Sequence, residues 1–207
     1  MSTKISASTE QIKALREQTG AGIVECKRAL SESNGNLDEA LKILREQGAS
    51  VAAAKAGRAT AHGIVSSYVH GGKIAVLVEV NCESDFVARN DSFNHFVHEV
   101  CLQVASMGPS YVSREDVPES DMSQMMEDLQ EELAQVDAEV APAMQQSFVE
   151  NFYKEKVLLD QPYVKDSSRT IRDLLHEAVA AIRENIVIRR FVRVELGGRM
   201  ISSTTKI

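Results

Sequence analysis

Residues 1–50 carry apolar side chains three and four positions apart, the spacing that places them on one face of a helix. A capping-box pattern at 8–11 starts the first predicted helix, and Gly20 ends it. A second predicted helix ends at 34–35, and a third occupies 36–48. This pattern predicts a bundle of three short helices around a shared apolar centre.

Residues 51–62 are rich in alanine and show no apolar period, so we expect a linker, helical in part, between two domains. After it the period changes to two, and 63–70 and 73–81 alternate as strands do. Gly71 and Gly72 between them can both adopt the positive φ of a tight turn. The pattern therefore predicts a β-hairpin.

The next segments return to helical spacing. A helix capped by Asp91 is expected to end at Gly108, and 122–140 carries a short heptad pattern that Pro142 breaks. Together with the apolar positions that follow, this pattern predicts a helical hairpin at about 121–158. A seam this brief is typical of a globular core rather than of a free coiled coil.

The last third of the chain predicts a loop at 160–168, a helix at 171–182 and a strand at 185–196. We expect this strand to join the hairpin in a small antiparallel sheet covered by helices. Residues 63–197 would then form an α+β domain, and 198–207 a frayed tail.

The formal net charge of −7 disfavours nucleic acid as a partner, because an acidic surface repels phosphate groups. The basic cluster of Arg189, Arg190 and Arg193 lies in the last predicted strand and is interpreted as a solvated face. No stretch approaches the roughly 18 apolar residues that span a bilayer. The N-terminus also lacks the apolar core of a signal peptide, so we expect a soluble chain with no membrane partner.

Three cysteines, Cys26, Cys82 and Cys101, are an odd number without a CxxC pair or zinc-site spacing. They are expected to be reduced thiols. The Gly-rich stretch 20–22 lacks the preceding strand and the lysine of a phosphate-binding loop, so it is interpreted as a helix–helix turn.

A catalytic or metal site is only weakly supported. Cys82 could serve as a nucleophile near Asp85, with His95 and His98 one helix turn apart further along. A buried thiol and two exposed histidines explain the same residues, and no third metal ligand falls at useful spacing. Glu83 and Asp85 flank a strand exit and are expected to be solvated carboxylates. We therefore predict no catalytic residue, no metal and no cofactor.

The stretch EVNCESDFVARN ends an apolar strand with Asp85, Phe86 and Val87. A Phe at a strand exit either folds back into its own core or is presented to a partner as an interface anchor. The residues alone leave both interpretations open.

Two stretches resemble the signatures of the elongation factor Ts family, LREQTGAGIVECKRAL at 15–30 and VNCESDFVARND at 80–91. DEALKILREQG, VLLDQPYVKD and ENIVIRRFVRVELG are similar to family segments too, so the resemblance covers nearly the whole chain. The chain has Ile-Val-Glu at 23–25 where the family usually has Met-Met-Asp, and Ser84 where it usually has Thr. Both departures preserve the character of the residues.

The resemblance implies a guanine-nucleotide exchange factor for elongation factor Tu, which acts in translation elongation and is not an enzyme. It implies that Ser84, Asp85, Phe86 and Val87 insert beside the Mg²⁺ site of that GTPase and weaken metal and nucleotide binding. It further implies an N-terminal bundle of the ubiquitin-associated type that docks on the nucleotide-binding domain. The contact residues carried over for that bundle are Arg16, Thr19, Gly20, Gly22, Ile23 and Val24.

The resemblance also bears on assembly and location. A chain of this length is similar to the short form of the family, with a single core half, whose members pair as homodimers. The expected location is a bacterial cytoplasm, or an organelle matrix after processing of a longer precursor. The alternative function is a ubiquitin-associated-like adaptor that binds protein without affecting nucleotide exchange.

Overall fold

The computed structural model describes residues 7–133 and 141–205, which fall into two compact units. The first unit consists of the described residues in Met1–Gly63, Asn81–Phe96 and Arg172–Val187. The second unit consists of the described residues in Ile64–Val80, Val97–Ile171 and Ile188–Ile207. The domain boundaries at 50, 62 and 197 stay predictions.

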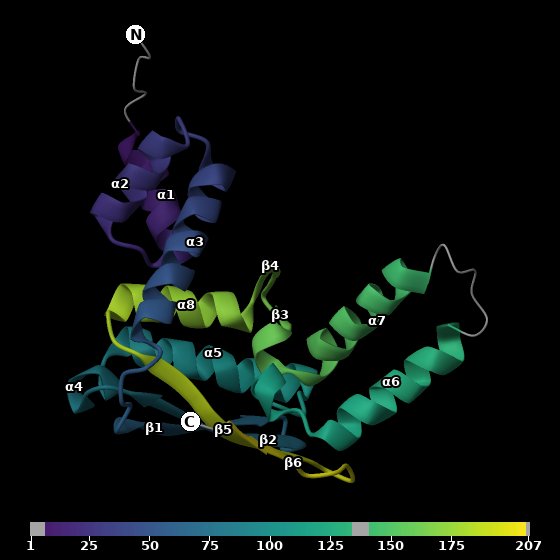
Figure 1. Cartoon of the computed structure of the whole chain (residues 1–207). Coiled ribbons are helices and arrows are strands. Elements are labelled where there is room, and N and C mark those ends of the chain that lie inside the picture. Colours follow the sequence, from purple (N-terminus) through teal and green to yellow (C-terminus); the bar gives the residue numbers. More distant parts are fainter. Residues whose placement is uncertain (1–6, 134–140, 206–207) are drawn as a thin grey trace. The chain divides into compact units, whose positions relative to one another are not determined.

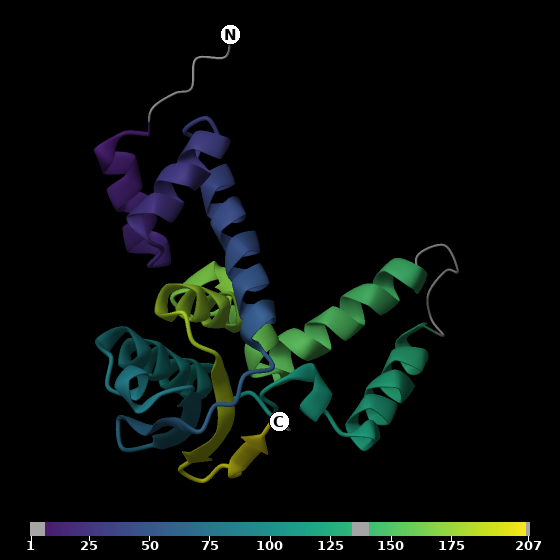
Figure 2. The same ribbon diagram turned by 60° about the vertical axis from the view of Figure 1, so that its left-hand side comes forward.

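The described elements comprise helices, two 3₁₀ turns and strands (Figures 1 and 2). The helices are α1 (Thr9–Thr19), α2 (Ile23–Glu32), α3 (Leu37–Lys55), α4 (Asp85–Ala88), α5 (Asp91–Met107), α6 (Glu119–Leu133), α7 (Ala141–Lys156) and α8 (Ile171–Ile182). The 3₁₀ turns are η1 (Arg114–Asp116) and η2 (Leu158–Asp160). The strands are β1 (His62–His70), β2 (Ile74–Cys82), β3 (Pro162–Tyr163), β4 (Asp166–Thr170), β5 (Ile186–Glu195) and β6 (Ile201–Thr204). The predicted α+β class is confirmed.

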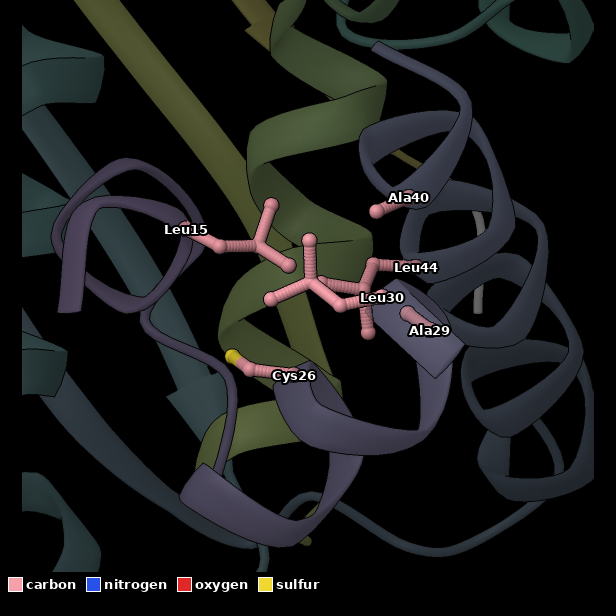
Figure 3. Close-up of a cluster of buried hydrophobic side chains, with 6 residues drawn as sticks. All are labelled: Leu15, Cys26, Ala29, Leu30, Ala40 and Leu44. Atoms are coloured by element: carbon pink, nitrogen blue, oxygen red, sulfur yellow. The ribbon is translucent and has the colours of Figure 1, made fainter. Parts of the chain in front are cut away.

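Helices α1 to α3 form the predicted bundle. The capping box is present, because the Ser8 side chain accepts a hydrogen bond from the Gln11 backbone and the Gln11 side chain accepts one from Ser8. Figure 3 shows that the buried side chains of the three helices point toward one centre. These side chains are Leu15, Cys26, Ala29, Leu30, Ala40 and Leu44. A bundle of the ubiquitin-associated type remains a prediction.

The third helix does not end at Gly48, as predicted, but continues to Lys55. Gly48 is buried beside the backbone of His176, and a Cβ there would lie 3.6 Å from the His176 carbonyl oxygen. A single glycine costs a helix only about 1 kcal/mol relative to alanine, and the alanines that follow restore helical propensity. The first residues of the predicted linker are therefore helical.

A four-stranded sheet with the order β1-β2-β5-β6 is the main β element. Gly71 and Gly72 both have positive φ in the β1–β2 turn, at 55° and 67°, as the hairpin prediction requires. Along β2, Val76, Val78 and Val80 are buried. Helix α5 runs along the sheet in Figure 1, and the Arg193 guanidinium on β5 donates to the Ala105 carbonyl of that helix, at 3.3 Å.

Two predictions for the second unit are wrong. The tail is not frayed, because β6 pairs antiparallel with β5 from Arg193–Ile201 to Arg190–Thr204. The predicted loop 160–168 contains the two-stranded β3–β4 sheet. Buried Gln161, whose side chain accepts from that of Gln103, fixes the start of β3, and this polar contact leaves no trace in apolar periodicity.

Two further details of the predicted helices change. Asp91 lies inside α5, and the Asn90 side chain accepts from the Ser92 backbone instead. In the helical hairpin, α6 buries Met125 and Leu129, whereas the predicted seam residue Met126 is exposed. The seam positions in 134–140 lie outside the described residues. Within the described part of the chain, none of the helices has the length and apolar character that crossing a membrane requires.

Candidate partner-binding site

Helix α4 presents Phe86 to solvent immediately after β2. Ser84 is its N-cap, and the Ser84 hydroxyl accepts from the Val87 backbone N–H at 3.3 Å. The helix has a buried side formed by Val87 and Ala88, which are 6% and 5% exposed. Phe86 projects the other way and is 81% exposed. Of the two interpretations left open by the sequence, the structure favours presentation of the ring.

The C-terminal end of α4 is also held. The Arg89 guanidinium donates to the Asp85 carboxylate at 2.6 Å across one turn, and both side chains are exposed. The Asn94 side-chain amide donates to the Ala88 carbonyl at 3.2 Å and to the Asn90 carbonyl at 2.9 Å. A four-residue helix would be marginal alone, so these bonds supply order that its own length does not.

The N-terminal end of α4 is tied to a segment about one hundred positions away. The Ser84 backbone N–H donates to Glu184 Oε2 at 3.0 Å, and the Ser84 hydroxyl donates to Glu184 Oε1 at 2.6 Å. The Asn185 backbone N–H donates to Glu83 Oε1 at 2.6 Å. Sequence reasoning missed Glu184 and Asn185, because neither periodicity nor a motif connects 83–84 with 184–185.

Glu83 is therefore not the solvated carboxylate that the sequence predicted. It accepts from Asn185 and forms an ion pair with Arg58 at 3.6 Å. Asn185, which is buried, donates from its side chain to the Ala56 carbonyl at 3.3 Å and the Arg58 carbonyl at 2.8 Å. The end of α3, the exit of β2 and the start of β5 meet at these polar contacts.

Cys82 ends β2 two positions before Ser84, and it lacks the exposure and lowered pKa of a nucleophilic thiol. It is buried, and its thiol donates to the Ser84 carbonyl at 3.2 Å. Burial raises the pKa of the Cys82 thiol, and the Glu184 carboxylate raises it further. His95 and His98 are exposed on α5, as expected. Within 7–133 and 141–205, no three Cys, His, Asp or Glu side chains gather as a metal site.

The turn between α1 and α2 is the second predicted contact region. Gly20 adopts φ 66° as the C-cap of α1. Thr19 is buried, and its hydroxyl donates to the Leu15 carbonyl at 2.7 Å and accepts from the Ala21 N–H at 3.2 Å. Its role in the structure is to hold the turn. Ile23 and Val24 follow at the start of α2 and are 57% and 81% exposed.

The same turn forms one wall of a cavity of about 910 Å³ within the first unit, and α3 and α8 supply the rest. All six predicted N-terminal contact residues line it: Arg16, Thr19, Gly20, Gly22, Ile23 and Val24. Glu25 accepts from the Gly22 N–H with one carboxylate oxygen and from the Arg183 guanidinium with the other. Residues 183–185 therefore contact α2, the end of α3 and Ser84, the N-cap of α4.

Comparisons with known proteins agree with this picture. The sequence profile of the family described as Elongation factor TS matches residues 1–198. A relative named Elongation factor Ts from Thermoanaerobacter sp. (strain X514) is 47% identical over 202 residues, which cover 96% of this chain and 99% of the relative. Another of that name, from Coprothermobacter proteolyticus, is 51% identical over 197 residues, which cover 94% of this chain and 99% of the relative. The chain therefore belongs to the elongation factor Ts family.

Proposed function

We propose that this chain acts in translation elongation as a guanine-nucleotide exchange factor for elongation factor Tu. Family membership supports the general role. The observation that carries the proposal is the 81% exposure of Phe86 on a helical turn that is hydrogen-bonded at both ends. A large rigid apolar group fixed in place and exposed to water is the usual anchor of a protein interface.

Exchange of this kind needs no bond chemistry. A nucleotide bound with a Kd of about 1 nM and an association rate of about 10⁶ M⁻¹s⁻¹ leaves at about 10⁻³ s⁻¹, which is slow for repeated cycling. A protein that binds the nucleotide-free form more tightly accelerates release. By linkage, nucleotide weakens the grip of that protein by the same factor.

The proposed mechanism places α4 against the nucleotide-binding domain of the GTPase. The Phe86 ring enters beside the site at which the GTPase holds Mg²⁺ and displaces the groups that support the metal. Asp85, kept in place by Arg89, orients the entry, and Val87 secures the turn to its own core. Because the turn is ordered before binding, little conformational entropy is lost when the ring is inserted.

A second contact supplies affinity in this proposal. Ile23 and Val24 offer exposed apolar surface at the start of α2, and Arg16 adds a cation on the same cavity wall. These residues dock the bundle on the GTPase, while α4 acts on the metal site. In this proposal, α2 determines how tightly the chain binds the GTPase, and α4 determines how fast nucleotide leaves it.

We also propose that the chain forms homodimers through the outer face of its sheet. Val65, Ser67 and Val69 are exposed on β1, and Leu77 is exposed on β2. An apolar face of this kind is typical of an interaction surface. Light scattering at micromolar concentration should give twice the chain mass, and the mass of a single chain would contradict the dimer.

Release of fluorescent GDP from elongation factor Tu tests the exchange function. The wild-type chain should accelerate release, and Phe86→Ala should remove at least about 2 kcal/mol of the effect, roughly 30-fold in rate. Leu196→Ala is the matched control, because Leu196 is 76% exposed in the second unit. Full stimulation by Phe86→Ala would contradict the mechanism, and binding without acceleration would support the adaptor function.

A further inference from the structure

The carboxylate of Glu184 accepts hydrogen bonds from both the hydroxyl and the backbone N–H of Ser84. One oxygen accepts from the Ser84 hydroxyl at 2.6 Å, and the other accepts from the Ser84 backbone N–H at 3.0 Å. Hydrogen bonds to an ionised acceptor are shorter and about twice as strong as neutral ones, and two parallel bonds also fix direction. Ser84 is thus held in one orientation by a residue from a distant part of the chain.

Glu184 is itself well anchored. Its neighbour Arg183 ends α8 in the left-handed region, with φ 67°, and donates its backbone N–H to the Val179 carbonyl at 2.9 Å. A residue other than glycine adopts this conformation only when its surroundings impose it. Arg183 is paired with Glu25, and Asn185 is bonded to Glu83 and to the end of α3. The backbone on both sides of Glu184 is therefore fixed.

The bond from Ser84 to Glu184 also determines the cap of α4. A hydroxyl has one proton, and here it points at Glu184, so a lone pair is left to accept from the Val87 N–H. That second bond is the N-cap of a helix with only four residues. Phe86 lies in the chain between Ser84, whose hydroxyl accepts this bond, and Val87, whose N–H donates it, so the direction of the ring depends on the bonds that link Glu184, Ser84 and Val87.

We propose that Glu184 is a positioning residue that acts on nucleotide release through Phe86, an inference that rests on the proposed exchange function. Glu184 does not need to touch the partner. It keeps the backbone of α4 in the one orientation from which the Phe86 ring can enter the GTPase. Without Glu184, the ring stays exposed but samples several directions, and only a fraction of encounters is productive.

The test is a double-mutant cycle on the maximal rate of GDP release at saturating chain. Glu184→Ala should slow release about tenfold, which corresponds to about 1.4 kcal/mol. In a Phe86→Ala background the same substitution should change the rate less than about twofold, because a residue that acts through Phe86 has no effect once the ring is gone. Glu127→Ala, on the exposed face of α6, is the matched control for losing a carboxylate.

A substitution at Ser84 repeats the test without altering Glu184. Ser84→Ala removes the hydroxyl that bonds both Glu184 and the Val87 N–H but keeps the backbone N–H bond to Glu184, so it should slow release by no more than Glu184→Ala does. Equal slowing by Glu184→Ala in both backgrounds, or no slowing in either, would overturn the inference. Slowing by Phe86→Ala without slowing by Glu184→Ala would overturn it too, while leaving the exchange function intact.

A direct readout separates the inference from exchange activity. The chain has no Trp, so Phe86→Trp introduces a single indole at the site, which can be excited selectively over the four tyrosines. Its time-resolved anisotropy in the free chain should show a restrained indole, and adding Glu184→Ala should increase the amplitude of fast motion at least twofold. The same anisotropy decay with and without Glu184→Ala would refute the positioning role, whatever the release assay shows.

Discussion

The α1–α2 turn and helix α4 present apolar side chains to solvent to the same extent, since Val24 and Phe86 are both 81% exposed. They are held in different ways. Within the turn, hydrogen bonds join residues two to five positions apart, such as those of Thr19 to Leu15 and to Ala21, and Glu25 on α2 also pairs with Arg183. Helix α4 has local bonds as well, but its N-terminal end is fixed by two bonds to Glu184, one hundred positions away.

The two regions should therefore be disturbed by different substitutions. A turn bonded mainly to its own helices keeps its shape as long as those helices fold. A turn held by distant residues can be released by one substitution that leaves the fold intact. We expect the position of Val24 to depend on the free energy of folding of the bundle. The orientation of the Phe86 ring should depend on the few hydrogen bonds that hold α4.

The largest expected loss of stability comes from a cavity in the core of the bundle that carries the α1–α2 turn. Leu30 is fully buried in the bundle core (Figure 3), and Leu30→Ala should lower the free energy of unfolding by about 3 kcal/mol. Urea unfolding followed by circular dichroism measures this loss. Leu37→Ala, on an exposed residue at the start of α3, should cost less than about 1 kcal/mol. Equal losses from the two substitutions would contradict the assigned core.

A smaller effect is expected from the turn backbone itself. Gly20 has φ 66°, a conformation that costs a residue with a Cβ about 1 kcal/mol. Gly20→Ala should therefore lower the free energy of unfolding by about that amount, although a Cβ there meets no neighbour within 4 Å. Gly57→Ala is the control, since Gly57 is also open but has no positive φ. A neutral Gly20→Ala would show that the turn is not locally constrained.

The sequence predicted the α1–α2 turn better than the exposure of Phe86, because the turn depends mainly on residues close to it in the chain. The capping box at Ser8 and the stop at Gly20 both depend on residues within one helical turn, and each is present. The exposure of Phe86 was left open, because it depends on which side of α4 is buried. That choice is made by tertiary packing, which a local pattern does not contain.

The errors in the predicted elements have the same origin. Strand β6 pairs with β5 although its sequence, Ile-Ser-Ser-Thr, has little apolar signal. Gly48 continues a helix because alanines follow it. Glu83 looked solvated because its partner, Asn185, lies far along the chain. In each case a distant neighbour or a propensity beyond the local motif decided the outcome.

The smallest expected effects concern two buried thiols, one beneath each region. The Cys26 thiol donates to the Ala21 carbonyl in the turn at 3.7 Å, and the Cys82 thiol donates to the Ser84 carbonyl at 3.2 Å. Burial raises the pKa of both, so at pH 8 alkylation should be at least about tenfold slower in the native chain than in the unfolded chain. Alkylation with iodoacetamide followed by mass spectrometry resolves the two sites.

Glu184→Ala should accelerate alkylation of Cys82 several-fold and leave Cys26 unchanged. The reason is that Glu184 both holds Ser84 and raises the pKa of the Cys82 thiol. Faster modification of both thiols would indicate general loosening rather than local release of α4. Cys82→Ser should leave GDP release unchanged, and a large loss of exchange would instead favour a thiol mechanism.

In the proposed mechanism, α4 sets the rate of nucleotide release and the α1–α2 turn sets the affinity for the GTPase. The most direct measurement is the rate of GDP release from elongation factor Tu as a function of chain concentration, for Phe86→Ala and Val24→Ala. Phe86→Ala should lower the rate at saturation at least about 30-fold, whereas Val24→Ala should raise the half-saturating concentration about fivefold with an unchanged plateau. An unchanged plateau for Phe86→Ala would contradict the proposed role of α4 in nucleotide release.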